Sequence, residues 1–168
     1  MTEPKTNGAE VSVHKHVARQ VLSFTLEHET YAVDILRVRE IRGFSAVTHM
    51  PDTPSHLLGV LNLRGSIVPI VDMRRRIGVA PMEPSALTVI IVLSVESARG
   101  RREFGLVVDG VSDVVDLAPE NIKEAPDLND GQREQLISAI ASVNDRLIMV
   151  LDIDRMLAAE KLDLPAAA

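Results

Sequence analysis

The sequence contains no cysteine and no tryptophan, and its aromatic residues are limited to one tyrosine and three phenylalanines. Without cysteine the chain can form neither disulfides nor thiolate metal sites. The shortage of aromatic rings argues against base-stacking surfaces and sugar platforms, which depend on aromatic faces. A formal net charge of −6 argues further against nucleic acid or an anionic membrane as the main partner.

Long apolar runs and targeting signals are also missing. No stretch reaches the length of about 18 apolar residues that a transmembrane helix needs, so we expect no direct membrane insertion. The polar N-terminus lacks the apolar segment of a signal peptide. These features predict a cytoplasmic protein with one folded region over residues 19–160, between flexible tails over residues 1–18 and 161–168.

No catalytic motif is present. The sequence lacks a zinc-protease motif, a P-loop, a nucleophile elbow and a dinucleotide-binding fingerprint. Aspartates near predicted strand ends are numerous enough to hide an acid–base pair, although caps and turns explain them more simply. They are Asp34, Asp72, Asp109, Asp113, Asp116 and Asp152. We therefore predict a protein that is not an enzyme and holds no metal or cofactor, with a small hydrolase as the alternative.

Aliphatic residues in strand patterns dominate what the sequence does contain, because apolar residues make up 46% of it. Residues 61–64 alternate between apolar and polar, and residues 67–71 are apolar on both faces, as expected at the centre of a small barrel. Residues 64–66 predict the turn between these strands, with a glycine that tolerates a positive φ. Asp72 predicts the N-cap of a helix over residues 73–77.

Two segments of the sequence resemble earlier ones. Residues 31–41, shifted by 73 positions, align their apolar residues with those of 104–114. Residues 60–77, shifted by 80 positions, align with 140–157 without a gap. Shared order and spacing favour a duplicated unit over chance.

The duplication predicts the architecture. The copies extend over residues 20–78 and 86–157, which we expect to form two intertwined barrel lobes, and Asp72 of the first falls on Asp152 of the second. About five short strands in each copy suit a small barrel. A barrel of about 65 residues buries too little surface to be stable alone, so we expect an apolar seam shared by two barrels. Within the first copy, the spacing of three between Val38 and Ile41 fits either a helical turn or a twisted strand.

Charged residues differ between the copies. Arg64 lies beside the predicted turn, where it is either solvated or paired with Glu40. Glu40 falls on the acidic Asp113 of the second copy, whereas Arg64 falls on Asn144 and its charge is lost. Such differences are where the roles of duplicated units can diverge. The arginines at 74–76 form either a solvated face or a docking surface for an acidic partner.

Four segments resemble the CheW family of chemotaxis coupling proteins, namely YAVDILRVREIRG, GVLNLRGSIVPIVDMR, TVIIVL and FGLVVDGVSDVV. The similarity extends from Gln20 to Met156. It implies a mainly β fold of two small five-stranded SH3-like barrels packed around a shared aliphatic core, with short helices that include a C-terminal one. It also implies the absence of enzymatic activity.

The resemblance further implies two protein partners. Proteins of this family join the regulatory domain of a CheA-type histidine kinase to the cytoplasmic tips of methyl-accepting chemoreceptors, in receptor arrays at the inner membrane, with ring or lattice assembly. An adaptor of a parallel pathway, such as surface motility, is the alternative. By position, the implied kinase-binding residues are Val38, Glu40, Gly59 and Arg64. The implied receptor-binding residues are Gly105, Val111 and Val114.

Overall fold

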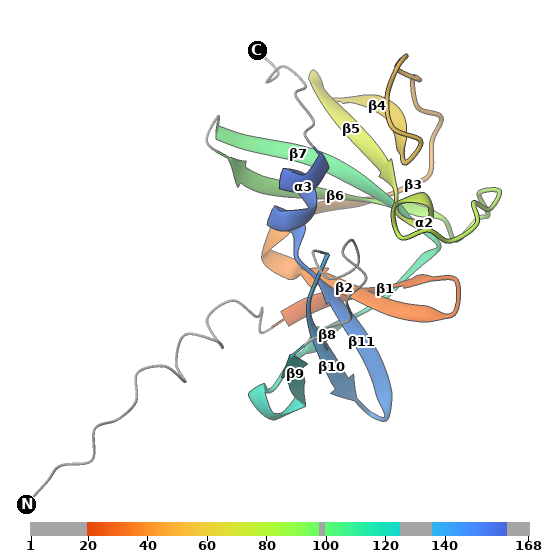
Figure 1. Cartoon of the computed structure of the whole chain (residues 1–168). Coiled ribbons are helices and arrows are strands. Elements are labelled where there is room, and N and C mark those ends of the chain that lie inside the picture. Colours follow the sequence, from red (N-terminus) through yellow and green to blue (C-terminus); the bar gives the residue numbers. More distant parts are fainter. Residues whose placement is uncertain (1–19, 98–99, 125–135, 161–168) are drawn as a thin grey trace, which may run out of the picture.

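The computed structural model of the chain describes residues 20–97, 100–124 and 136–160. The tails predicted over residues 1–18 and 161–168 lie outside these ranges. The described chain forms two β-sheets, one above the other in Figure 1, with short helices where the sheets meet.

The five-stranded sheet is built from the middle of the chain, in the strand order β3-β6-β7-β5-β4. Its strands are β3 (Val38–Gly43), β4 (Leu57–Leu63), β5 (Ser66–Asp72), β6 (Val89–Ser97) and β7 (Gly100–Val108). The short helix α2 (Met73–Arg76) follows β5.

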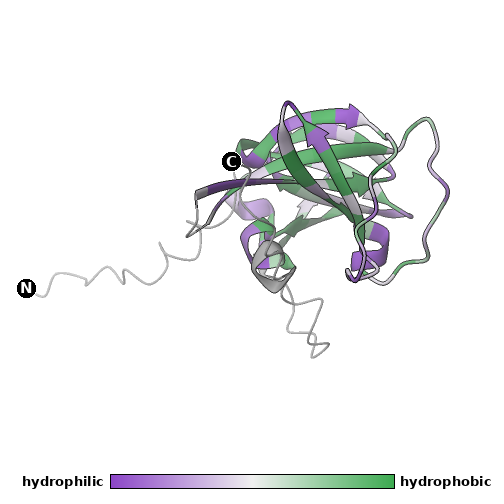
Figure 2. Cartoon of the chain, turned by 90° about the horizontal axis from the view of Figure 1, so that it is seen from above, coloured by the Kyte–Doolittle hydropathy of each residue, from purple (hydrophilic) through white to green (hydrophobic). Residues whose placement is uncertain are grey.

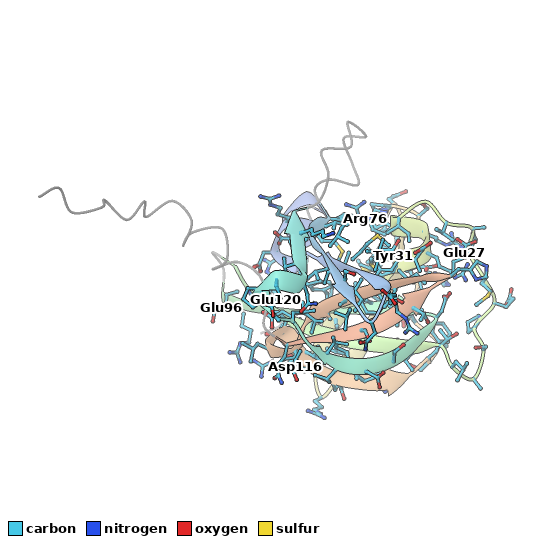
Figure 3. The ribbon with its side chains drawn as sticks, turned by 90° about the horizontal axis from the view of Figure 1, so that it is seen from below. Glu27, Tyr31, Arg76, Glu96, Asp116 and Glu120 are labelled. Carbon is cyan, nitrogen blue, oxygen red and sulfur yellow. The ribbon has the colours of Figure 1, made fainter. Side chains whose placement is uncertain are left out.

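The six-stranded sheet combines the beginning and the end of the described chain, in the order β8-β1-β2-β11-β10-β9. Its strands are β1 (Gln20–Leu26), β2 (Glu29–Asp34), β8 (Gly110–Asp116), β9 (Ile122–Glu124), β10 (Ile137–Val143) and β11 (Arg146–Leu151). The one-turn helices η2 (Ile35–Arg37) and η3 (Pro119–Asn121) precede β3 and β9, and α3 (Ile153–Glu160) follows β11. Along β1, Glu27 at the hairpin turn and Asp116 lie at opposite ends of this sheet (Figure 3).

The two sheets repeat one arrangement. The order β3-β6-β7-β5-β4 corresponds to β8-β1-β2-β11-β10, and each sheet contains one parallel pair, β5–β7 or β11–β2. Ile70 pairs with Gly105 in the first, and the residues at offsets of 80 and 73, Val150 and Ala32, pair in the second. The pairing registers of the two sheets are therefore related by the offsets of 73 and 80 that relate the sequence segments.

The two copies exchange their first hairpins. The β1–β2 hairpin belongs to the first copy but lies in the six-stranded sheet, beside β8 and β11 of the second. Likewise, β6–β7 begins the second copy but lies between β3 and β5 of the first. The chain crosses between sheets through η2 and again at Asp109, between β7 and β8. Each sheet is thus assembled from strands of both copies. The copies over 20–78 and 86–157 are intertwined.

Alternate residues of the exchanged strands face two different cores. In β6, Ile91 and Leu93 join a large cluster with residues from both sheets. Ile90 and Val92 join a smaller cluster made by the five-stranded sheet. Both faces are therefore buried, which explains why such strands are apolar throughout. Seen from above, the central strands are accordingly hydrophobic over most of their length (Figure 2). The predicted mainly β fold of two barrel-like sheets around a shared core is confirmed.

The shared core, which is mostly aliphatic, also contains aromatic side chains. Three of the four aromatic residues, Phe24, Tyr31 and Phe104, lie in the cluster between the sheets. The rings of Phe24 and Tyr31 stack with their centroids 6.1 Å apart. The few aromatic side chains are thus concentrated where the sheets meet, and there they contribute more buried apolar area per residue than any aliphatic side chain.

Strand β3 resolves the ambiguous spacing between Val38 and Ile41. Ile41 pairs with Ile91 of β6, and a bulge interrupts the register between Val38 and Glu40. Because a bulge adds one residue to a strand, the apolar spacing becomes three instead of two. The twisted strand is therefore right and the helical turn is wrong.

The predicted turn and cap are confirmed. Arg64 and Gly65 have φ values of 54° and 86°. Positive φ at both central residues defines the type I′ turn that suits a two-residue hairpin. The carboxylate of Asp72 accepts a hydrogen bond from the amide of Arg74 at 3.1 Å and so caps α2.

The arginine run at 74–76 does not form one solvated face. Arg74 points inward, and its Nε and Nη2 donate to the two carboxylate oxygens of Asp109 at 2.7 and 2.6 Å. Both side chains are largely buried, with 12% and 17% of their areas exposed. Arg75, by contrast, is exposed and pairs with Asp72 of its own helix at 3.3 Å. The basic run is therefore divided between an internal contact and the surface.

The carboxylate of Asp109, at the second crossover between the sheets, accepts hydrogen bonds from Arg74 and from the amide of Glu27. Burial raises the pKa of its carboxyl group, but the hydrogen bonds from Arg74 and from the amide of Glu27, with the charge of Arg74, outweigh this effect. The pKa of Asp109 is therefore lowered from its ordinary value of 3.8. The hydrogen bonds to Asp109 likewise raise the pKa of Arg74.

We expect Gly59→Ala to destabilise the fold by about 1–3 kcal/mol. Gly59 is buried with a φ of 152°, and an added Cβ would collide with the carbonyl oxygen of Thr48. That carbonyl accepts the amide of Val60 in an isolated bridge. Thermal unfolding measures the loss, with Gly43→Ala as the control because Gly43 has open space. Equal melting temperatures for the two variants would refute this prediction.

Asp109→Asn should remove an acid-sensitive part of the stability, worth roughly 2–4 kcal/mol at neutral pH. Because the folded-state pKa of Asp109 lies below its unfolded value, the stabilisation is present above about pH 4 and disappears as the pH falls through the folded pKa. Urea unfolding should show the difference between wild type and variant shrinking at low pH. The exposed Asp113→Asn serves as the control. A difference that stays constant with pH would contradict the assignment.

Candidate functional site

Glu40 on β3 and Arg64 in the β4–β5 turn meet at the surface of the five-stranded sheet. Nη2 of Arg64 lies 3.7 Å from Oε2 of Glu40, and 88% of the Arg64 side chain is exposed. So loose and solvated a pair contributes little to stability, typically about 0–1 kcal/mol. The structure therefore brings together two of the four implied kinase-binding residues in a contact that leaves the arginine head available to a partner.

Exposed apolar side chains occupy equivalent places on both sheets. Ile41 of β3 and Ile67 of β5 are each about half exposed. The offsets of 73 and 80 carry them onto Val114 of β8 and Leu147 of β11, which are also about half exposed. As names for these two sets of residues, we call Glu40, Ile41, Arg64 and Ile67 the first surface, in which Glu40 contacts Arg64, and Asp113, Val114, Asn144 and Leu147 the second surface. Exposed apolar residues often mark partner-binding surfaces.

The charges of the two surfaces differ. The first has the Glu40–Arg64 pair, whereas the equivalent positions in the second are Asp113 and the neutral Asn144. The turn backbone is similar in the two surfaces, because Asn144 and Asp145 have positive φ values, as Arg64 and Gly65 do. The duplicated framework thus presents similar apolar side chains with unlike charge.

Val38 and Val111 occupy equivalent positions beside these surfaces. Each is partly buried and packs against the shared core. Val38 pairs with Leu93, and Val111 pairs with Phe24, next to the bulge in each edge strand. A partner that contacts either valine would therefore touch an edge strand tied directly to the core.

The two glycines in the implied sites are buried. Gly59 accommodates the backbone of Thr48, and Gly105 lies in β7 under Ile70 and Ile90, whose side-chain carbons would lie 2.7 and 2.8 Å from an added Cβ. Both glycines therefore lie beneath the surface, where they can affect a partner only through the residues packed on them. Their assignment to kinase and receptor binding stays a prediction.

A pocket of about 440 Å³ opens between η2, β10, β11 and the start of α3. Two of the aspartates considered for catalysis, Asp34 and Asp152, line it together with Asp154. Asp34 accepts the amide of Leu36 at 2.9 Å, and Asp152 accepts the amide of Arg155 at 3.0 Å. Asp154 forms an ion pair with Arg37 at 2.8 Å. Each carboxylate thus has a structural role as a cap or an ion-pair partner, as the turn-and-cap interpretation expects.

Neither a metal site nor a membrane span is evident in the part of the chain that the structure covers. Over residues 20–97, 100–124 and 136–160, no three His, Cys, Asp or Glu side chains gather in a way that could hold a metal ion. In the same ranges, no helix has the length and apolar character needed to cross a membrane.

The sequence did not single out Ile67 and Leu147 as surface residues. Both lie in strongly apolar strands, where a strand pattern counts every apolar residue as core. The sequence showed that Ile67 and Leu147 are related by an offset of 80, but this relation does not indicate whether their side chains are buried or exposed. Only the position of each residue just after a hairpin turn, at the end of the sheet, leaves its side chain exposed.

Comparisons with known proteins agree with the duplicated fold. A family model described as a CheW-like domain matches residues 20–161. The chain is 39% identical over 148 residues to a chemotaxis protein CheW of Klebsiella aerogenes, covering 88% of this chain and 87% of that protein. It is 36% identical over 138 residues to a probable chemotaxis protein CheW of Rhizobium etli, with coverages of 82% and 86%.

A solved structure has the same fold. The crystal structure of the scaffolding protein TtCheW from Thermoanaerobacter tengcongensis superimposes with a TM-score of 0.73 at 27% identity, covering 82% of this chain and 90% of that one. The extent of these matches, together with the two duplicated sheets and their edge surfaces, leads to one conclusion. The chain belongs to the CheW family of chemotaxis adaptors.

Proposed function

We propose that this chain couples the regulatory domain of a CheA-type histidine kinase to the cytoplasmic tips of methyl-accepting chemoreceptors, and so places the kinase under receptor control. Membership of the CheW family over residues 20–161 is the observation that carries the proposal. The coupling is non-catalytic, and the protein acts in the cytoplasm within receptor arrays at the inner membrane.

The first surface is the proposed kinase side. Val38, Glu40 and Arg64 lie on β3 and on the β4–β5 turn of one sheet, and Gly59 lies in β4 of the same sheet, against the backbone of Thr48. The exposed arginine offers a charge for selecting the partner, and Ile41 and Ile67 offer apolar area. Charged groups at the rim of an interface mainly determine specificity and association rate.

The second surface is the proposed receptor side. Val111 and Val114 lie on β8, an edge strand of the six-stranded sheet, whereas Gly105 lies in the interior of the other sheet. A receptor tip is a helical hairpin, and a helix can place an apolar stripe against exposed aliphatic side chains. The surface lacks aromatic side chains, which are usually enriched at interface centres, so the contact should be modest in affinity.

Two modest contacts on one small protein are sufficient for coupling. Holding kinase and receptor on the same adaptor raises their effective concentration for one another and permits ring or lattice assembly. Control of the kinase then requires that ligand-bound and free receptors differ in how they bias its active state.

Reconstitution tests the proposal. Receptor signalling fragments and a CheA-type kinase should give low autophosphorylation without this chain and strongly increased, receptor-dependent autophosphorylation with it. Pull-downs with the kinase regulatory domain and the receptor fragment, separately and together, should show binding to each. Kinase activity that is independent of this chain would refute the proposal. Binding to the kinase and receptor of a surface-motility pathway instead would identify the alternative adaptor.

Charge reversal at Glu40 or Arg64 should weaken binding to the kinase domain by about tenfold, or roughly 1.4 kcal/mol, while the fold survives. The pair is too solvated to support the fold, so the melting temperature should change little. Calorimetric titration with the kinase domain measures the loss. Arg146→Glu, beside the equivalent turn of the other sheet, is the matched control and should bind normally. If the double reversal restores no binding, Glu40 and Arg64 do not act as a pair.

A further inference from the structure

Two ion pairs connect the terminal helices of the copies to the crossovers between the sheets. Arg74 of α2 binds Asp109, which we call the inner brace. Asp154 of α3 binds Arg37 of η2 at 2.8 Å, which we call the outer brace. Each brace therefore joins the end of one copy to the point where the chain passes from one sheet to the other.

The two braces are related by the duplication, but their polarity is reversed. The offset of 80 carries Arg74 onto Asp154, so an arginine in α2 becomes an aspartate in α3. At the crossovers, the offset of 73 carries Asp109 back to Leu36, the neighbour of Arg37. An acidic crossover thus faces a basic helix in one half and a basic crossover faces an acidic helix in the other. The two ion pairs are not equivalent residue by residue, but in each half an ion pair joins the helix to a crossover.

The inner brace is by far the more constrained of the two. Arg74 makes two hydrogen bonds to the Asp109 carboxylate, and its Nη1 donates to the carbonyl oxygen of Ala80 at 2.9 Å. Asp109 also accepts the amide of Glu27 at 2.7 Å, while its own amide donates to the carbonyl oxygen of Thr25. Asp109 therefore holds α2 of the five-stranded sheet and the β1–β2 turn of the six-stranded sheet at the same time. The outer brace is an ion pair between Arg37 and Asp154, whose side chains are more exposed, at 33% and 55% of their areas.

Apolar burial is non-directional, so the apolar core between the sheets prefers one rotation between them less strongly than a directional polar contact does. A bidentate arginine–carboxylate pair is directional, because its two parallel hydrogen bonds require one relative orientation of the groups. The inner brace supplies such a constraint between α2 and the β1–β2 turn.

We propose that Arg74 and Asp109 are positioning residues that fix the orientation of the two sheets, and with it the geometry between the first and second surfaces. The role of the two residues in orienting the sheets is independent of the proposed function. Only its effect on coupling between kinase and receptor rests on that function. An adaptor that holds two partners must transmit force or orientation between them. Loosening the brace uncouples the partners without removing either binding surface.

Distances between the sheets test the inference directly. The chain has no cysteine, so spin labels can be placed at Arg39→Cys on β3 and Arg146→Cys on β11, both exposed positions. Pulsed electron resonance should give one narrow distance distribution for the otherwise wild-type chain. Asp109→Asn and Arg74→Gln should each broaden or shift it. The double variant should broaden it no further, because either change already breaks the brace.

Matched controls separate positioning from general loss of stability. Arg75→Gln removes an arginine from the same helix that pairs only within that helix, and its distribution should match the wild type. All measurements are made far below the melting temperature, where a variant that is merely less stable has an unchanged distance distribution. If Asp109→Asn does not fold, Arg74→Lys keeps the charge, loses the bidentate geometry and tests the same contact. Distributions identical to wild type in the variants that fold would overturn the proposal.

The reconstituted kinase assay tests the consequence. Asp109→Asn should retain its affinity for the kinase domain and the receptor fragment measured separately, while receptor control of the kinase falls by roughly five- to tenfold. Full receptor control despite a broadened distance distribution would overturn the link between sheet orientation and coupling. If the wild-type chain binds neither partner, the proposed function fails, whereas the distance measurement requires no partner and still decides the role of the brace.

Discussion

The two central hairpins must each bury both of their faces, and the rest of the structure depends on this constraint. In β6, Ile90 faces the interior of its own sheet while Ile91 faces the other sheet. A sheet with such strands is unstable alone, because one apolar face would remain in water. Exchange of the hairpins buries both apolar faces of each hairpin, so each sheet depends on the other for its stability. The two sheets are therefore one cooperative unit, although each has the shape of a small domain.

Duplication supplies a framework on which chemical differences become functional. Strand order, parallel pairing and bulge positions are the same in both halves, so they reflect architecture. The differences are at the exposed turn, with Arg64 against Asn144, and at the helix, with Arg74 against Asp154. One difference distinguishes the two surfaces, and the other changes how each helix is attached. An adaptor needs unlike surfaces in a fixed relation, and these substitutions address both requirements.

Much of the fold followed from the residues. The apolar strands, the turn at Gly65, the Asp72 cap and the duplication depend on local periodicity, turn chemistry and spacing, which act over a few residues. The spacing of three between Val38 and Ile41 left a helical turn and a twisted strand open, and the bulge in β3 decides between them. Of the site, the contact between Glu40 and Arg64 was one of two alternatives, the other being a solvated arginine.

The sequence by itself determined the strands, the repeated unit and the family, because these depend on local patterns and on motif residues. Only the tertiary structure decided which sheet each hairpin joins, since strand pairing between distant segments is determined by long-range burial that no local pattern records. It also decided that Arg74 faces Asp109 while Arg75 faces solvent. In a helix of one turn, adjacent arginines look alike in sequence, and only the position of the crossover selects which one is buried.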